Sequence, residues 1–270
     1  MFTDAVRMAA QFTFPYVGLR RRRCTHVYST MGAFVMLNAQ GWALTSSHLV
    51  DEILAVEAEV KSAAEDPGDQ VCTDHVEIWA LPGFSDTRPR LGEATVRPLC
   101  DLAVVRLEPF DATAIGAFPL LRNVKSDPIE QGMSVCRLGY PFHDIAAGWD
   151  AERHEFALGP EAFPVPSFAL DGIVARFHRV SAENSAETAT FIETSTPGLR
   201  GQSGGPLLDT HGRVCGIQSH TTHLDLGFDA GFQSGETVVT ERQFLNVGAA
   251  THISEVVTLL DQVGASYTFG

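Results

Sequence analysis

Residues 199–207 form the sequence Leu-Arg-Gly-Gln-Ser-Gly-Gly-Pro-Leu, the most informative segment of the chain. A serine hydroxyl is a weak nucleophile, so a reactive serine needs a nearby base and donors for the negative charge that develops during attack. Gly201 lets the backbone turn so that its own N–H and that of Ser203 point at one oxygen. On its own, however, the segment also fits a tight Gly-Gly-Pro turn with a solvated serine.

Two segments nearer the N-terminus supply partners for this serine. Residues 44–50, Leu-Thr-Ser-Ser-His-Leu-Val, predict a strand whose end carries His48. Residues 101–107, Asp-Leu-Ala-Val-Val-Arg-Leu, predict an apolar strand headed by Asp101. Taken singly, a histidine satisfied by the backbone or an aspartate that caps a turn is the simpler interpretation. Together with Ser203, in this order, they indicate a base and a carboxylate that serve the serine.

These three segments resemble those of the trypsin-like serine peptidases, most closely the bacterial HtrA/Deg type, in which the order is also His, Asp, Ser. Residues 132–141, which end in Gly-Tyr-Pro, resemble a second-barrel strand of that family. Residues 172–174 resemble its Gly-x-Val strand. The resemblance covers roughly residues 30–265; its triad segments are specific, whereas the loops between them are not.

The resemblance implies an all-β fold of two packed six-stranded antiparallel β-barrels of the chymotrypsin type, with a C-terminal helix. Residues 1–270 are expected to form one peptidase domain, with barrels at about 25–115 and 130–250 and the helix at about 252–264. Short apolar runs between Gly, Pro, Asn and Asp predict many strands independently, and apolar spacing predicts the terminal helix. Residues 61–70 predict a surface loop, and residues 111–132 a connection between the two β halves.

The same resemblance implies a role for each site residue. His48 would take the Ser203 proton and return it to the leaving amine, while Asp101 would hold His48 in the right tautomer. The amides of Gly201 and Ser203 would form the oxyanion hole. The implied function is a serine endopeptidase that hydrolyses peptide bonds in protein or peptide substrates through an acyl-enzyme intermediate.

The chain departs from digestive trypsins just before the nucleophile. Trypsins that mature by cleavage carry there an aspartate that pairs with the new N-terminal amine. Gln202 cannot form this ion pair, so no zymogen step of that kind is expected. HtrA-type enzymes also lack that aspartate. Little sequence follows the terminal helix, so the PDZ module that HtrA-type enzymes often carry is not expected.

The resemblance places Pro197, Gln218, Ser219 and His220 around the substrate residue that precedes the cleaved bond. Trypsins that select Lys or Arg have an aspartate where this chain has Pro197. A small, neutral or polar substrate residue is therefore expected. Residues 223–244 look inserted and predict a mobile flap or partner-binding loop beside the pocket.

Composition excludes several other classes of protein. The 270-residue chain has a net charge of −14, which argues against nucleic-acid binding, and the basic run 20–23 predicts only a solvated loop or strand edge. No signal peptide and no apolar run of membrane length is visible, so a cytoplasmic protein without membrane association is expected.

The cysteines and histidines predict no bound group. Five widely spaced cysteines match neither a zinc nor a disulfide pattern. His220, His223 and Asp225 lack a further ligand of defined geometry, so surface-loop polarity explains them better than a metal. We therefore expect no metal and no cofactor.

Two alternatives stay open at this point. Gly201 to Gly205 also satisfies the Gly-x-Ser-x-Gly elbow of α/β-hydrolase esterases, but that elbow needs a helix after the serine, and Gly-Gly-Pro disfavours one. The other alternative is a catalytically latent protease fold that acts as a binding or regulatory module. Such a fold would be activated by a regulatory protein partner.

Overall fold

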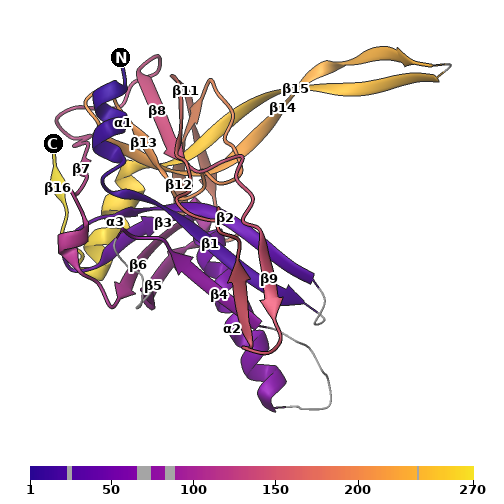
Figure 1. Ribbon diagram of the computed structural model, residues 1–270. Coiled ribbons are helices and arrows are strands. Elements are labelled where there is room, and N and C mark those ends of the chain that lie inside the picture. Colours follow the sequence, from indigo (N-terminus) through magenta and orange to yellow (C-terminus); the bar gives the residue numbers. More distant parts are fainter. Residues whose placement is uncertain (23–25, 66–73, 83–88, 236) are drawn as a thin grey trace.

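The computed structural model describes the chain except residues 23–25, 66–73, 83–88 and 236 (Figure 1). Its regular structure is dominated by β-strands, arranged in two sheets that pack together, and a helix follows the last long strand. The predicted fold class, mostly β with a C-terminal helix and of the double-barrel type, is therefore confirmed.

The first sheet contains six antiparallel strands in the order β4-β1-β2-β3-β6-β5. Their bounds are β1 Thr13–Arg22, β2 His26–Met36, β3 Trp42–Thr45, β4 Asp74–Trp79, β5 Arg90–Arg97 and β6 Leu102–Glu108. The sheet thus begins at Thr13, before the residue 25 expected from the sequence. Among the described residues, no pairing joins the two edge strands β4 and β5.

The second sheet has the strand order β13-β8-β11-β12-β15-β14-β7-β16, and an additional pairing joins β13 to β14. The first six of these strands therefore form a closed ring, in which each strand pairs with two neighbours. Their bounds are β8 Ser134–Gly139, β11 Phe168–Ser181, β12 Thr188–Thr194, β13 Pro206–Leu208, β14 Val214–Ser234 and β15 Thr237–His252, and the short strands are β7 Leu120–Leu121 and β16 Thr268–Phe269. A separate hairpin pairs β9, Ala147–Asp150, with β10, Glu155–Leu158.

One apolar core joins both sheets to the terminal helix α3, Ile253–Val263. Leu44 and Val104 of the first sheet belong to the same buried cluster as Leu207 of the second sheet and Val256 of α3. As predicted, α3 ends at Gly264, which has a left-handed backbone that a side chain would strain. Burial against both sheets explains why the apolar face of α3 follows the helical repeat.

Helix α2, Ser47–Glu65, corrects two predictions. The strand expected to carry His48 ends at Thr45, and His48 lies in the first turn of this helix. The loop expected at residues 61–70 is helical as far as Glu65, and residues 66–70 lie outside the described part of the chain. Leu49, Val50 and Ile53 are spaced to lie on one helix face, and all three are buried in the core of the first sheet. A shorter helix, α1, spans Thr3–Ala9.

The basic run lies largely within β1, and two of its arginines form ion pairs with acidic side chains. Arg20 pairs with Glu59 of α2, and Arg21 pairs with Asp74 of β4. The Arg21 guanidinium also lies 3.8 Å from the centre of the Trp149 ring. These arginines therefore connect structural elements. The solvated loop or strand edge predicted from the sequence is wrong, because β1 lies between β4 and β2 and both side chains are largely buried.

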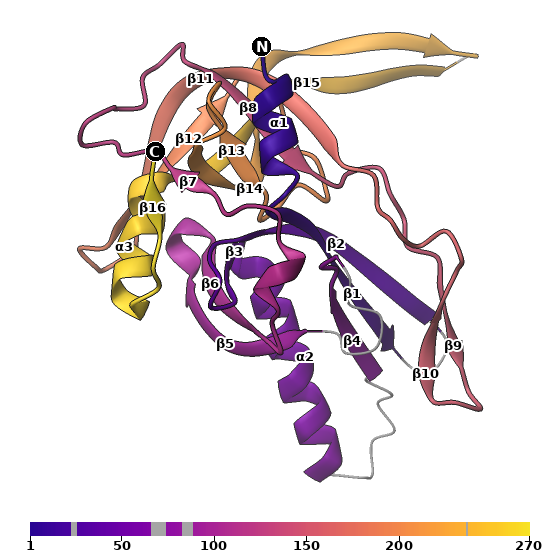
Figure 2. The ribbon, with the colours of Figure 1, turned by 60° about the vertical axis from the view of Figure 1, so that its left-hand side comes forward.

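Residues 223–235 and 237–244 form the outer part of a long β14–β15 hairpin that projects from the body (Figures 1 and 2). The two strands are paired along their length, with register shifts between Gln218 and Thr221 and between Asp225 and Asp229. Among the described side chains of the hairpin, those of Leu226, Phe228, Phe244 and Leu245 are large, apolar and exposed. Among the described residues, no helix is long and apolar enough to cross a membrane.

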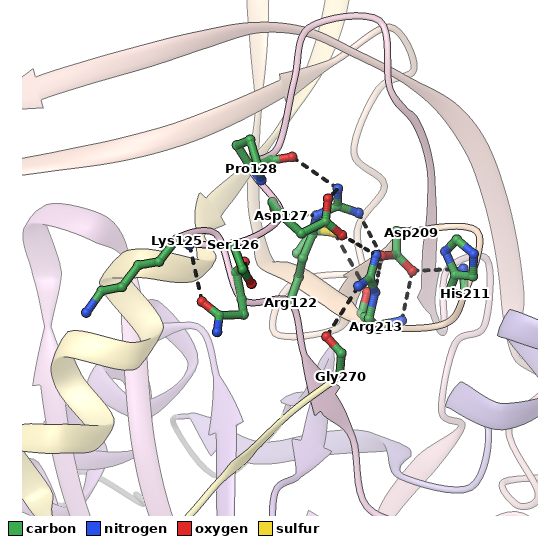
Figure 3. A network of polar contacts seen from close by, with 11 residues as sticks. Arg122, Lys125, Ser126, Asp127, Pro128, Asp209, His211, Arg213 and Gly270 are labelled. Atoms are coloured by element: carbon green, nitrogen blue, oxygen red, sulfur yellow. Dashed lines mark hydrogen bonds and ion pairs between the residues drawn. The ribbon is translucent and has the colours of Figure 1, made fainter.

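An ion network centred on the buried Asp209 links the connection between the sheets to the β13–β14 turn (Figure 3). Asp209 accepts hydrogen bonds from Arg122 Nη1 at 2.9 Å and Arg213 Nε at 2.7 Å. Asp127 accepts one bond from each arginine, and Arg213 also donates to the carbonyl of Gly270. Burial raises the pKa of Asp209, but the bonds from Arg213 and His211 outweigh it and lower that pKa overall.

We predict that Asp209→Ala lowers the free energy of unfolding by about 3–5 kcal/mol, because it leaves the nearly buried Arg122 without this carboxylate. Urea unfolding followed by circular dichroism measures the change. The control is Glu155→Ala, which removes an exposed carboxylate near Arg153 and should cost less than about 1 kcal/mol. Equal effects of the two substitutions would contradict the stabilising role of the network.

Candidate active site

A cavity of about 590 Å³ brings His48 and Ser203 together. His48 reaches it from α2, and Ser203 from the loop that precedes β13. The cavity is lined by His48, Arg137, residues 197–200, Gln202, Ser203, residues 218–221, His223, Asn246 and Ala249. Parts of the chain far apart in sequence therefore meet at one concave site.

Asp101 anchors the first turn of α2. It follows the short helix Pro98–Cys100 with a left-handed backbone, φ 48°, and is therefore a turn residue just before β6. Its Oδ1 accepts hydrogen bonds from the His48 backbone N–H at 3.0 Å and from the Ser47 hydroxyl at 3.1 Å. A carboxylate at a helix N-terminus is favoured by the unpaired N–H groups there.

The same carboxylate lies against the His48 ring. The Nδ1 atom of His48 is 2.9 Å from each Asp101 oxygen. This hydrogen bond raises the pKa of His48 above its ordinary 6.5, against the opposing effect of burial, and the charge of Asp101 adds to the rise. Since Asp101 occupies Nδ1, the other ring nitrogen, Nε2, is left to face a reacting group.

Ser219 of β14 supplies a further bond to Asp101, from its hydroxyl to Oδ2 at 2.6 Å. Burial raises the pKa of Asp101, but the bonds from His48 and Ser219 and the charge of His48 outweigh burial. The pKa of Asp101 is therefore lowered overall, and the group is ionised at neutral pH.

The loop around Ser203 has a backbone that requires glycine at two positions. Gly201 has φ +91°, and a Cβ there would lie 2.4 Å from the Tyr140 carbonyl oxygen. Gly204 has φ +83°, and a Cβ would lie 2.1 Å from the Ala33 carbonyl oxygen. Either side chain would displace the loop. The Gln202 side chain is buried within the loop, where its Oε1 accepts from the Leu199 N–H at 3.0 Å.

The Ser203 hydroxyl donates to the Ser219 carbonyl at 3.1 Å. In the described part of the chain, no hydrogen bond joins Ser203 to His48, although both side chains line the cavity. The N–H groups of Gly201 and Ser203 have no acceptor among the described residues, so both can serve a bound carbonyl oxygen. His48 and Asp101 are thus in direct contact, whereas Ser203 meets them through Ser219.

The four residues expected around the substrate, Pro197, Gln218, Ser219 and His220, all line this cavity. Burial lowers the pKa of His220, whose Nδ1 is 2.8 Å from the Ser219 hydroxyl. Within the described chain, no group of three or more His, Cys, Asp or Glu residues is placed to hold a metal ion.

Two observations go beyond the sequence-based expectations. Ser203 is followed by strand β13 and not by a helix, so the α/β-hydrolase alternative is wrong. Arg137 of β8 also lines the cavity, with its side chain buried. From the sequence, this arginine was expected only as part of a strand. The one sign of a special role was its charge within the apolar run Val-Cys-Arg-Leu.

Comparison with known proteins agrees with this architecture. Residues 31–217 match the family described as "Trypsin-like peptidase domain". None of the curated protein sequences matches the chain.

Among solved structures, a variant of the HtrA-type protease AlgW with a tripeptide is 22% identical, with a TM-score of 0.54. The match covers 97% of this chain and 63% of that one, so this chain spans less than two thirds of its length. The active form of the Rv3671c protease from M. tuberculosis is 16% identical, with a TM-score of 0.52, over 98% of this chain and 86% of that one. At these identities the structural likeness concerns the fold.

We predict that Asp101→Asn lowers the pKa of His48, because the amide removes the charge and the hydrogen bond that raise it. An NMR titration of the His48 ring protons measures the shift. The matched control Asp51→Asn removes a weaker charge effect, so it should lower that pKa by less. Equal shifts in the two variants would contradict the assignment of Asp101 as the main partner.

Proposed function

The chain belongs to the trypsin-like peptidase domain family, and from this premise we propose that it is a serine endopeptidase using His48, Asp101 and Ser203. One observation carries the proposal. His48, whose Nδ1 is bound to Asp101, lines the same cavity as Ser203, beside two amides that can receive an oxyanion. The proposed reaction is hydrolysis of peptide bonds in protein or peptide substrates.

In the proposed reaction, the Ser203 hydroxyl leaves the Ser219 carbonyl and rotates toward His48. Nε2 of His48 takes the hydroxyl proton as Oγ attacks the substrate carbonyl carbon, and the carbonyl oxygen becomes negative. The Gly201 and Ser203 amides would stabilise that oxygen, and one such donor is typically worth about 3–4 kcal/mol in the transition state. Protonated His48 then gives the proton to the leaving amine, which leaves an acyl group on Ser203.

Deacylation repeats these steps with water. His48 takes a proton from the water, the hydroxide adds to the acyl carbon, and the Ser203 oxygen leaves and recovers its proton. Asp101 keeps its charge throughout and stabilises the protonated imidazole, consistent with its lowered pKa. The AlgW relative contains a tripeptide, which supports a peptide as the substrate.

Trypsin-type activation at a new N-terminus is not part of this proposal. Gln202 occupies the position before the nucleophile and is uncharged, with its side chain buried in the loop. It therefore offers no carboxylate to a new ammonium group. We propose that the catalytic loop forms without that ion pair.

A latent state is the second candidate, and one contact favours it. The Ser203 hydroxyl donates to the Ser219 carbonyl rather than to His48. A regulatory protein partner that shifted this hydroxyl toward His48 would activate such a protein. The exposed apolar side chains of the β14–β15 hairpin support a partner-binding role for that segment.

We also propose a reducing compartment, the cytoplasm, as the location. Cys100, Cys136 and Cys215 are free and buried, and burial raises the pKa of their thiols to about 12, 11 and 12, respectively. Such thiols are packed as small apolar groups rather than paired as disulfides.

We predict that a fluorophosphonate probe labels the wild-type chain at Ser203, as detected by mass spectrometry of the modified peptide. Ser203→Ala should abolish labelling, and His48→Ala should slow it by about 10²–10⁴-fold, because general-base assistance is lost. The exposed Ser266→Ala serves as the matched control and should label like the wild type. A wild-type chain that stays unlabelled at every pH would favour the latent module.

The labelling rate should rise with pH and level off, with a midpoint above 6.5, because only neutral His48 accepts the Ser203 proton. Asp101→Asn should shift the midpoint to lower pH and reduce the plateau by about 10⁴-fold, since the favoured tautomer is lost. Rates measured between pH 5 and 9 test both effects. A midpoint that does not move in this variant would count against the His48–Asp101 pair as the titrating unit.

A further inference from the structure

Arg137 is a buried cation on the wall of the candidate active site. Its side chain belongs to β8, is 1% exposed and lines the cavity shared by His48 and Ser203. Nη2 donates to the Thr194 hydroxyl, but Nε and Nη1 have no partner among the described residues. Buried arginines are normally paired with carboxylates, because an uncompensated charge in a protein interior is costly.

The Arg137 guanidinium occupies space that is open because two neighbouring residues are glycines. A Cβ on Gly248 of β15 would lie 1.9 Å from Nη1, which no real side chain could tolerate. A Cβ on Gly198 would lie 3.2 Å from the same atom. The cation is therefore enclosed by backbone from two walls of the cavity, so its position is defined by packing.

The cavity offers Arg137 no negative partner. None of the described residues that line it is an aspartate or a glutamate. Glu193 precedes Thr194, the hydroxyl partner of Arg137, in the sequence. Its carboxylate, however, binds Arg176. Asp101 is engaged by His48 and Ser219. Burial lowers the pKa of Arg137 only to about 10, so the guanidinium stays charged at neutral pH.

We infer that Arg137 selects substrates with an aspartate or glutamate immediately before the cleaved bond, whose carboxylate would bind the free guanidinium N–H groups. The inference rests on the proposed function and adds the substrate class to it. Arginine suits this task, because its planar donors bind a carboxylate with charge-assisted hydrogen bonds. An acidic substrate residue thus replaces the small, neutral or polar one expected from the sequence, which did not place Arg137 in the pocket.

Peptidyl diphenyl phosphonates test the inference, because they label the active-site serine while presenting a chosen side chain to the pocket. Labelling rates of the full chain are compared for probes with Glu, Asp, Gln, Asn and Ala at that position. We expect Glu or Asp to exceed its own amide by about 100-fold or more, since a site built to pair a charged group rejects the isostere. The comparison of Glu with Asp measures the depth of the pocket.

Variants locate the source of this preference. Arg137→Met should remove the preference for acid over amide, and Arg137→Lys should keep part of it. The matched control Arg179→Met removes an exposed arginine of β11 by the same substitution and should keep the full preference. Fluorophosphonate labelling and thermal melting of each variant separate loss of selectivity from loss of folding.

The possible results are separable. Equal rates for acid and amide probes, with normal fluorophosphonate labelling, overturn the inference and leave the proposed function standing. No labelling by any probe overturns both. If Arg137→Met does not fold, the ratio of acid to amide rates in the wild-type chain decides alone, because it needs no variant.

Discussion

The carboxylate of Asp101 accepts hydrogen bonds from both halves of the molecule. From the first sheet side come the His48 backbone and ring and the Ser47 hydroxyl, and from the second sheet comes the Ser219 hydroxyl. One ionised group therefore fixes the start of α2, the orientation of the imidazole and the position of β14. Because each donor stabilises the charged form, the lowered pKa of Asp101 and the raised pKa of His48 have a common cause.

The loop at Ser203 is held in place by close backbone contacts with the first sheet. Gly204 lies against the Ala33 carbonyl, and the Ala33 N–H donates to the Ser203 carbonyl at 2.8 Å. The serine is thus held against β2 of the first sheet while its own chain continues into the second. In the same arrangement the Ser203 hydroxyl donates to the Ser219 carbonyl, so the proposed reaction requires this one side chain to rotate toward His48.

The sequence predicted the parts of the fold that local patterns determine. Trp42–Thr45 and Pro206–Leu208 are short apolar runs bounded by glycine, serine or aspartate, and they are strands with those bounds. His48 was expected at a strand end, because it follows the apolar run Trp42–Leu44 closely, but the strand ends at Thr45 and a helix begins at Ser47. The helical spacing of Leu49, Val50 and Ile53 could have revealed α2, but it becomes decisive only when the sheet that buries them is known.

Arg137 shows why the proposed substrate pocket was harder to predict than the placement of His48, Asp101 and Ser203. The three proposed catalytic residues each have characteristic flanks, whereas the proposed role of Arg137 depends on Gly198 and Gly248, which are distant in sequence. The Ser203 to Ser219 contact likewise depends on the placement of β14 beside the loop. Such relationships come from tertiary packing and leave no periodic pattern along the chain.

The buried cation also has an energetic consequence for the free protein. A guanidinium enclosed without a carboxylate destabilises the empty pocket, and an apolar side chain of similar volume would avoid that cost. The chain carries a net charge of −14, yet this repels an acidic substrate only over the Debye length of about 8 Å at physiological salt. Within the cavity, where no acidic side chain is among the described lining residues, the local attraction of Arg137 is the stronger effect. The unpaired guanidinium thus lowers the folding stability of the free protein and strengthens binding of an acidic substrate. Such a trade between stability and function is common in proteins.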